Sequence, residues 1–358
     1  MIISSRYEIS GDDPFRGGMS EVRKGKDLHL DRDVALKCLQ PFQDPQRIID
    51  EQTALQEVTS KHVVQLLDIV QEKLDSVNRT FLVIEYIDGA DLQEFTFEYN
   101  EEYLIMLWQI ASGLSQIHSF SVIHRDIKPG NIRIDQEGVA KIFDFGLARQ
   151  QGVNNKTQNA MGTPLYIAPE MFGDSTINFT ISADVFSFGV MALTLLKRQP
   201  PTWVSQLPRS IPVGAVAAHI PEFPASIADI IQRCLSETPD RRPSMHDVCS
   251  AISKILLKDK HTAQLVLAGS VSNIDKDRRE GFPKVVITTS QEVVSGLKIR
   301  YDGYDFIVVE NIGDVVANNL PIKPGAKLAP SCVIAFPRTG STQPYFATFN
   351  VNQPEVLI

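Results

Sequence analysis

The sequence predicts an α+β protein in which a mainly helical segment lies between two β-rich segments. Residues 7–90 contain apolar runs of strand length, with one stretch of apolar residues at helical spacing between them. Residues 91–258 carry long periodic apolar segments, which predict helices. From residue 284 onward, apolar and polar residues alternate between turn residues, which predicts strands again. The clearest candidates are the strands 34–36 and 81–84 and the helix 103–117.

The composition is that of an ordinary globular protein and argues against several classes of function. The chain has 358 residues, enough for about two domains at ~150 residues each. It carries 43 acidic and 35 basic residues, and this acidic balance argues against general nucleic-acid binding, which usually needs a basic face. No apolar run approaches the ~20 residues that span a membrane, so we expect neither a nucleic acid nor a membrane as a partner.

The cysteines indicate the compartment. Cys38, Cys234, Cys249 and Cys332 are widely separated and show no metal-binding spacing. We expect them to be reduced and mostly buried thiols, as in a cytoplasmic protein. The first residues lack the long apolar core of a signal peptide, which agrees with a cytoplasmic location.

A change of character along the chain predicts the domain boundaries. We expect the first domain to cover residues 1–262. A linker over 263–280 should follow, because 275–280 is a run of charged residues that reads as solvated chain. We expect residues 281–358 to form a small all-β domain, built as a sandwich or a barrel.

Three local signals support these elements. Ser244 and Asp247 have the spacing of a capping box and predict the start of a helix between them. The Asp-Gly pair at 302–303 lies between two alternating runs and predicts a hairpin. The Pro-Gly pair at 324–325 predicts a further turn.

Four short motifs occur in a fixed order. Residues 34–37 read VALK, residues 124–131 read HRDIKPGN, residues 144–146 read DFG, and residues 168–170 read APE. Together they resemble the eukaryotic-type protein serine/threonine kinase family, and the Gly-Gly-Met loop near the N-terminus resembles its bacterial members. The resemblance covers roughly residues 7–258.

The resemblance implies a bilobal protein-kinase fold. It implies a β-rich N-lobe over about residues 1–88, a helical C-lobe over about 89–262, and ATP in the cleft between them. His124 and Phe145 resemble the packed spine that links the lobes, and Asp184 resembles the aspartate that anchors the catalytic loop.

The phosphates of ATP require cations that are held in place. Lys37 would contact the α- and β-phosphates, and a lysine beside a cleft needs an acidic partner to hold it. Glu51 matches the family's spacing for that partner, and Glu57 is the rival with a poorer spacing. The plainer interpretation of Glu51 is a surface carboxylate on a helix.

The motifs at 124–131 and 144–146 imply the reacting groups and the metal ligands. Asp126 would accept the proton of the substrate hydroxyl, and Lys128 would neutralise the transferring phosphate. Asn131 and Asp144 offer oxygen ligands of the kind Mg²⁺ prefers, so ATP and Mg²⁺ are the implied cofactors. Lys128 at this position resembles serine/threonine rather than tyrosine specificity.

Further residues resemble the nucleotide pocket. Ile84 resembles the gatekeeper, and the backbone around it would hydrogen-bond the adenine edge. Phe15 and Ser20 replace the first and third glycines of the family's glycine-rich loop, which weakens that motif. The residues implied to contact nucleotide are Gly17, Gly18, Val22, Ala35, Lys37, Ile84, Glu85, Ile87 and Arg133.

Arg133 departs from the family, which usually places a large apolar residue beneath adenine. Three arrangements stay open at this point: a guanidinium stacked on an aromatic face, a head group in solvent with the stem covering adenine, or a shifted strand register.

Regulation is indicated by Arg125, which precedes Asp126 as in kinases whose activation loop is ordered by phosphorylation. Thr157 is the predicted autophosphorylation site, and Thr163 lies in the stretch that faces the substrate. The alternative, to which we give the same weight, is an activation loop that is ordered without any phosphate.

We therefore expect an enzyme that transfers the γ-phosphate of ATP to Ser/Thr hydroxyls of protein substrates, including itself. The alternatives are a pseudokinase scaffold that binds nucleotide or partners without turnover, and a small-molecule kinase. Residues 281–358 carry no chemical motif, and we expect them to bind a protein or peptide partner, with structural packing against the large lobe as the rival. The oligomeric state is not indicated.

Overall fold

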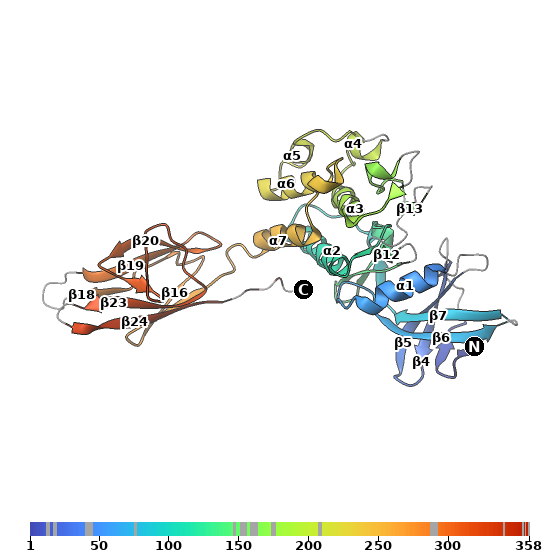
Figure 1. The fold of residues 1–358 in the computed structure, drawn as a ribbon, viewed down its shortest axis with the longest axis horizontal. Helices are drawn as coiled ribbons and strands as arrows, with labels where there is room; N and C mark the ends of the chain where they lie inside the picture. The colour runs from blue at the N-terminus through green and yellow to red at the C-terminus, as the bar shows by residue number, and fades with distance from the viewer. Residues whose placement is uncertain are drawn as a thin grey trace. The chain divides into compact units, whose positions relative to one another are not determined.

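The computed structural model describes residues 1–11, 15–16, 20–39, 46–74, 77–145, 148–150, 156–157, 164–172, 177–206, 210–286, 293–338, 341–352, 354 and 356. The chain divides into two compact units, Met1–Ile252 and Ser253–Leu357 (Figure 1). The division falls earlier than the domain boundary predicted at residue 262.

The N-terminal part of the first unit is a seven-stranded antiparallel sheet in the order β1-β2-β4-β5-β7-β6, with β3 paired to β4. The strands are β1 (Ile2–Ile3), β2 (Tyr7–Ile9), β3 (Phe15–Arg16), β4 (Ser20–Asp27), β5 (Arg32–Leu39), β6 (Leu66–Leu74) and β7 (Val77–Glu85). The strands predicted at 34–36 and 81–84 are therefore present as parts of β5 and β7. Helix α1 (Gln46–Glu57) lies beside this sheet (Figure 1).

The next part of the unit is mainly helical. Its helices are α2 (Glu101–Ser119), α3 (Ile181–Thr194), α4 (Thr202–Ser205), α5 (Ala215–His219), α6 (Ala225–Cys234) and α7 (Met245–Leu256). The capping box at the start of α7 is confirmed, because the amide of Asp247 donates to Ser244 Oγ at 3.1 Å and the amide of Ser244 donates to Asp247 Oδ2 at 3.2 Å. Within the described residues, none of the helices is long and apolar enough to cross a bilayer.

Short strands and single-turn helices lie in the segments that connect these helices. A three-stranded sheet in the order β11-β10-β8 lies beside α2. The short strands are β8 (Gly89–Asp91), β9 (Val122–Ile123), β10 (Ile132–Asp135), β11 (Ala140–Ile142), β12 (Arg149–Gln150), β13 (Lys156–Thr157) and β14 (Ile177–Asn178). Four single-turn 3₁₀ helices accompany them at Leu92–Glu94, Pro129–Asn131, Pro169–Met171 and Pro239–Arg241.

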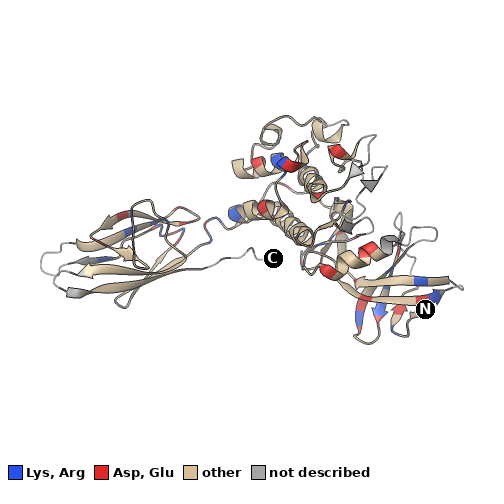
Figure 2. Ribbon diagram, in the orientation of Figure 1, with Lys and Arg blue, Asp and Glu red and all other residues tan. Residues whose placement is uncertain are grey.

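Charged side chains of both signs share the same surfaces. Figure 2 shows blue and red residues side by side on the N-terminal sheet. On this sheet Lys24 Nζ lies 2.7 Å from Asp33 Oδ2 across the β4–β5 pair. Because opposite charges alternate, the described strands of this sheet present no broad basic face.

The second unit is built from two antiparallel sheets that enclose one core. The six-stranded sheet has the order β16-β15-β24-β23-β21-β22, and in the other sheet β17 and β18 pair with one edge of β19 and β20 pairs with its other edge. The strands are β15 (Ala263–Leu267), β16 (Ser270–Ile274), β17 (Glu280–Gly281), β18 (Lys284–Val286), β19 (Val293–Tyr301), β20 (Phe306–Ile312), β21 (Val316–Ala317), β22 (Leu320–Pro321), β23 (Ser331–Arg338) and β24 (Ser341–Val351).

Aromatic side chains join the two sheets. The ring of Phe306 on β20 stacks on Tyr301 with centroids 4.7 Å apart and meets Phe349 of β24 edge-on at 5.5 Å. Phe336 and Ile334 are buried in the same cluster. Since two separate sheets face one another across this core, the arrangement is a sandwich and not a barrel.

The linker predicted over 263–280 is wrong for most of its length. Residues 263–267 and 270–274 form β15 and β16, and β15 pairs with β24 so that Leu265 lies opposite Phe349. The short alternation at 263–267 gains its partner from a strand more than 80 residues later in the chain, which no local pattern reveals. The charged stretch is a tight turn, in which the amide of Asp275 donates to the carbonyl of Arg278 at 3.0 Å.

The predicted hairpin forms with a longer turn than Asp-Gly alone requires. Tyr301 of β19 lies opposite Phe306 of β20, so four residues make the connection. The carboxylate of Asp302 accepts the amides of Tyr304 at 2.9 Å and Asp305 at 2.8 Å. Gly303 takes a φ of 106°, a conformation that favours glycine.

An ion pair fixes the helical part of the first unit. The guanidinium of Arg242, whose side chain is fully buried, makes two 2.7 Å hydrogen bonds to the carboxylate of Glu170. It also donates to the carbonyls of Ser236 at 2.8 Å and Ser182 at 2.9 Å. One side chain therefore ties the Pro169–Met171 turn, the start of α3 and the end of α6 together.

We predict that Glu170→Ala lowers the free energy of unfolding by about 3–5 kcal/mol, because it leaves a buried guanidinium without its counter-charge. Urea unfolding of the full chain measures the change. Glu222→Ala is the matched control: Glu222 pairs with Arg198 at 3.1 Å in solvent, so its removal should change stability little. Equal losses in the two variants would contradict the argument.

Candidate active site

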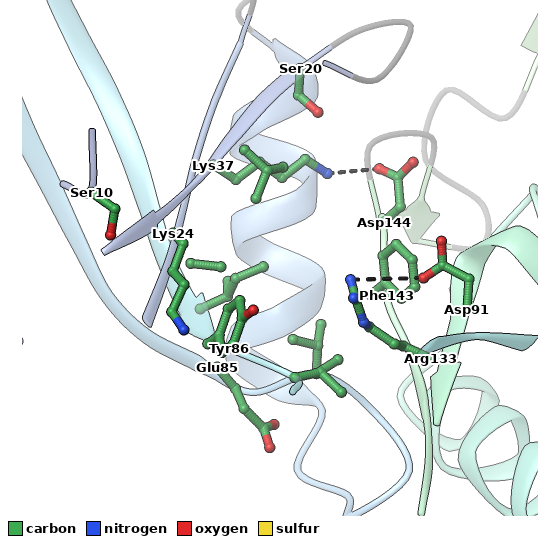
Figure 3. Close-up of a pocket in the computed structure, with 15 residues that line it drawn as sticks. Ser10, Ser20, Lys24, Lys37, Glu85, Tyr86, Asp91, Arg133, Phe143 and Asp144 are labelled. Carbon is green, nitrogen blue, oxygen red and sulfur yellow. Dashed lines mark hydrogen bonds and ion pairs between the residues drawn. The ribbon is translucent and has the colours of Figure 1, made fainter. Parts of the chain in front are cut away.

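A cavity of about 350 Å³ lies between the N-terminal sheet and the three-stranded sheet (Figure 3). Its size is within the range of small-molecule and cofactor sites. It is lined by seven of the residues predicted to contact nucleotide: Val22, Ala35, Lys37, Ile84, Glu85, Ile87 and Arg133. Ser20 and Asp144 line it as well. Tyr86, within the segment that resembles the adenine-binding hinge, lines it too. Residues brought together by folding that the motifs did not indicate are Ser10, Lys24, Val64, Asp91 and Phe143.

Lys37 is the central charge of this cavity. Its Nζ donates to Glu51 Oε1 of α1 at 2.6 Å and to Asp144 Oδ1 at 2.7 Å, and its side chain is 6% exposed. Glu51, not Glu57, is the residue that pairs with it, since Glu57 lies exposed at the end of α1. Burial acts against the ammonium, but the carboxylates of Glu51 and Asp144 outweigh it and raise the pKa of Lys37. The side chain therefore stays charged at neutral pH.

A second cluster forms around Asp126. Lys128 Nζ donates to Asp126 Oδ2 at 2.7 Å, and Asn131 Nδ2 donates to the same oxygen at 2.9 Å and to the Asp126 carbonyl at 2.8 Å. The residues come from one turn, where Pro129–Asn131 form a 3₁₀ helix that folds Asn131 back over Asp126. This turn thereby fixes the direction of the Asp126 carboxylate.

The backbone of this turn is held by a buried carboxylate. Asp184 at the start of α3 accepts the amides of His124 at 2.8 Å and Arg125 at 2.9 Å, and lies 3.0 Å from His118 Nε2. Burial tends to raise the pKa of Asp184, but the hydrogen bond and charge of His118 outweigh it and hold the pKa below its usual range. Arg125 takes a φ of 71°, and this left-handed turn is stabilised by the two amide bonds.

Asp144 is directed toward Lys37 by its backbone and its neighbours. Its φ is 65°, in the left-handed region that is uncommon for a residue other than glycine. The ring of the next residue, Phe145, is buried and lies 4.8 Å from the ring of His124. His124 Nε2 lies 3.1 Å from the carbonyl of Phe143. The packing of Phe145 and His124 thus turns the carboxylate of Asp144 into the cavity (Figure 3).

The oxygens near Asp144 fit a hard cation. The Asp144 side chain is 45% exposed, and its Oδ1 accepts from Lys37 Nζ. The side-chain nitrogen of Asn131 donates to Asp126, so the side-chain oxygen is the ligand atom that Asn131 can offer. The backbone carbonyl of Asn131 accepts the amide of Phe143 at 3.0 Å and thereby joins the two segments. Mg²⁺ prefers such oxygen ligands and keeps several waters, so these residues fit it.

Two lysines contact the residues at the edge of the cavity that was predicted to hold adenine. Lys141 of β11 forms a 2.7 Å ion pair with Glu85. Lys24 of β4 places its ammonium 4.2 Å from the ring centre of Tyr86. Lys24 and Lys141 lie outside the family motifs, so the sequence did not indicate these contacts.

The head group of Arg133 is bound by the backbone of β8, which none of the three open arrangements included, while the residue lines the cavity as the second of them requires. Its Nε and Nη2 donate to the carbonyl of Gly89 at 3.1 and 2.8 Å, and Nη1 lies 3.8 Å from Asp91 Oδ1. Arg133 pairs with Asp91 and Lys141 in the sheet, so the register is regular. Glycine at position 89 permits β8 to lie this close to β10, because a Cβ there would lie 1.8 Å from the carbonyl oxygen of Ile134. Burial raises the pKa of Asp91 against the opposing charge of Arg133.

The remaining predicted residues are only partly placed. Gly17, Gly18 and Thr163 lie outside the described residues. For Phe15 and Thr157 the structure describes the backbone, as parts of β3 and β13.

The structure shows the surroundings of two predicted regulatory residues, Thr157 and Arg125. The strand β13 that contains Thr157 pairs with β14, the strand that directly precedes Phe179. The guanidinium of Arg125 stacks 4.3 Å above the ring of Phe179.

Comparisons with known proteins agree with this geometry. The family model of the protein kinase domain matches residues 16–252. The serine/threonine-protein kinase PknA of Corynebacterium glutamicum is 34% identical over 260 residues, which cover 67% of this chain and 54% of that protein. The serine/threonine-protein kinase drp72 of Corynebacterium efficiens is 34% identical over 263 residues, covering 68% of this chain and 50% of that protein.

PknB of Mycolicibacterium smegmatis, also a serine/threonine-protein kinase, is 29% identical over 261 residues, covering 67% of this chain and 41% of that protein. The chain spans about half the length of the curated relatives it matches. The family model covers about two thirds of the chain and includes the Lys37 and Asp126 clusters. The chain belongs to the protein kinase family.

Proposed function

We propose that this protein transfers the γ-phosphate of ATP to serine or threonine hydroxyls of protein substrates, itself included, in the presence of Mg²⁺. The observation that carries the proposal is the Lys37 ammonium, which is bound to both Glu51 and Asp144 inside the cavity. The related proteins are named serine/threonine-protein kinases, which supports the same acceptor. The N-terminal sheet and the helical part act as the two lobes.

Lys37 supplies the fixed positive charge for the phosphates. A lysine kept charged by two carboxylates loses little on binding an anion, because its position is already set by 2.6 and 2.7 Å hydrogen bonds. In the proposed complex it contacts the α- and β-phosphates. Asp144 and Asn131 would hold Mg²⁺, which supplies neutralisation of the phosphate oxygens when bound.

Asp126 acts on the hydroxyl of the substrate. Lys128 and Asn131 both donate to its Oδ2 and fix the direction of the carboxylate, which accepts the hydroxyl proton in this proposal. Lys128 then lies beside the oxygen that attacks and can neutralise the group in transfer. Phosphoryl transfer depends mainly on such positioning and charge, which the turn at 129–131 provides.

Arg133 forms one end of the nucleotide pocket. Its guanidinium is bound to Gly89 and its stem lines the cavity, so the aliphatic part of the side chain supplies the contact that an apolar residue supplies in other members. Asp91 Oδ1 is buried beside it with no hydrogen-bond partner among the described residues. A hydroxyl of the nucleotide sugar can satisfy that oxygen.

Thr157 is proposed as a regulatory phosphorylation site, with Thr163 on the substrate-facing stretch. The pairing of β13 with β14 supports a link to Arg125, because Phe179 at the end of β14 covers the Arg125 guanidinium. A phosphate on Thr157 would compete with Phe179 for that guanidinium.

A location in the cytoplasm is proposed from the cysteines. The thiols of Cys38, Cys234 and Cys332 are buried and form no disulfide, as is usual in a reducing compartment.

The first test measures incorporation of labelled γ-phosphate from ATP into the chain and into a generic protein substrate. Asp126→Asn and Lys37→Met should each lower incorporation at least about 100-fold, since each removes a group that acts on the reacting atoms. Asp229→Asn and Lys73→Met are matched controls on exposed positions and should retain activity. Nucleotide binding without transfer in the unaltered chain would overturn the proposal in favour of a pseudokinase.

We predict that Arg133→Met raises the KM for ATP by roughly 3- to 10-fold with little change in kcat, because it loosens the pocket but does not touch the Asp126 cluster. Steady-state kinetics with a peptide substrate measure both constants. Arg300→Met, an exposed position in the second unit, is the control. An unchanged or lower KM in Arg133→Met would show that the guanidinium plays no part in holding the nucleotide pocket.

We predict that active protein carries phosphate on Thr157 and that Thr157→Ala lowers activity several-fold after incubation with ATP. Phosphopeptide mapping by mass spectrometry locates the phosphate. The inactive Asp126→Asn chain, mapped in the same way, shows whether the modification depends on the protein's own activity. Fully active protein with no phosphate on Thr157 would contradict this prediction.

A further inference from the structure

The second unit contains a hollow of about 340 Å³ that the phosphotransfer reaction does not use. It lies where β16, at the edge of the six-stranded sheet, comes near β17 and β18 of the other sheet. Figure 1 labels β16 and β18 on this unit. The volume is in the range that accommodates side chains or small ligands.

Part of the wall of the hollow is apolar. Leu265 and Leu267 of β15 line it from inside the sandwich, and Leu265 is 3% exposed. Phe282 lines it from the other side and is 38% exposed. Its ring rests on the backbone of β19, because a Cβ at Gly296 would lie 2.8 Å from Phe282 Cε2. The aromatic wall is therefore held in place while part of its ring faces outward.

The charges at the hollow are all positive. Arg278 and Lys284 belong to its lining, and no carboxylate does among the residues the structure describes. The ammonium of Lys284 lies 5.4 Å from the ring centre of Phe282. Of the acidic residues close to Arg278 in the sequence, Glu280 pairs with Lys298 at 3.1 Å and Asp275 accepts the amide of Arg278 at 2.9 Å, and Asp277 is not part of the lining. In a chain with a net charge of −8, this is a local site for an anion.

The strand beside the hollow has an open edge. In the described part of the chain, β16 pairs with β15 alone. Its register places Ser270 opposite Leu267 and Ser272 opposite Leu265, so the two serines share the face that carries the partly buried Leu267 and the buried Leu265. Both serines line the hollow. An unpaired strand edge presents amides and carbonyls that an additional strand can bind.

We infer that this edge binds an extended, acidic peptide segment of a partner protein, which adds as a strand beside β16. Alternate residues of an added strand point to the same side, about 7 Å apart. One inward side chain of the peptide is apolar and enters between Leu267 and Phe282. The inward side chain two residues away is a carboxylate that pairs with Arg278 and Lys284. The recognised pattern is thus an acidic and an apolar residue separated by one position.

This partner site is independent of the proposed phosphotransfer, because none of its residues belongs to the first unit. Binding should need neither ATP nor Mg²⁺. It should weaken as salt is raised, since the paired charges lie at the rim of the hollow where solvent screens them.

The test selects random octapeptides displayed on phage against the full chain, without nucleotide. Enriched peptides should share the acidic–x–apolar pattern in either direction. Their synthetic copies, measured by fluorescence anisotropy, should bind Arg278→Glu/Lys284→Glu at least about tenfold more weakly. Lys323→Glu makes a charge reversal in a turn outside the hollow and should bind within about twofold of the unaltered chain.

Two further measurements separate strand addition from simple charge attraction. Ser272→Phe fills the hollow without changing any charge and should also weaken binding about tenfold. An N-methyl group on the backbone of the peptide between its two key residues removes a strand hydrogen bond and should have a similar effect. Selection that enriches no common pattern would overturn the proposal. So would peptides that bind Arg278→Glu/Lys284→Glu and Ser272→Phe as well as they bind the unaltered chain.

Discussion

The buried ammonium of Lys37 is the interaction on which the first unit depends. A charge that is 6% exposed is stable in a protein only when opposite charges hold it, and here the carboxylates come from α1 and from the segment after β11. The N-terminal sheet, helix α1 and the mainly helical part of the first unit must therefore all pack correctly for this charge to be buried. The cavity beside Lys37 and the direction of Asp144 are consequences of that single requirement.

The same physical rule organises the rest of this unit. Asp184 is buried and directs the backbone of the His124–Arg125 turn through two amide bonds, while Arg242 is buried against Glu170. In each case a charged side chain from a distant part of the chain fixes a loop. The carboxylate of Asp126 can then stand in a defined direction on a loop, because Lys128 and Asn131 donate to it.

The second unit is held together by different means. Its core is a cluster of aliphatic and aromatic residues between two sheets, and its charges lie on the surface. Such a sandwich leaves edge strands, and most edges here are short or covered. The edge at β16 is the place where an apolar interior, a cationic rim and an unpaired strand meet, which is why the peptide site is inferred there and not on the first unit.

Local pattern was sufficient for the features that depend on neighbours in the sequence. The strands at 34–36 and 81–84, the capping box of α7, the hairpin at Asp302-Gly303 and the motif residues were all predictable, because turn chemistry, periodicity and motif spacing can be read along the chain. Three features could not be predicted in this way: the bond of Arg133 to Gly89, the ion pair of Lys141 with Glu85 and the inclusion of 263–274 in the sandwich. Each of these depends on a carbonyl, a carboxylate or a strand supplied from a distant part of the chain, and that proximity exists only after folding.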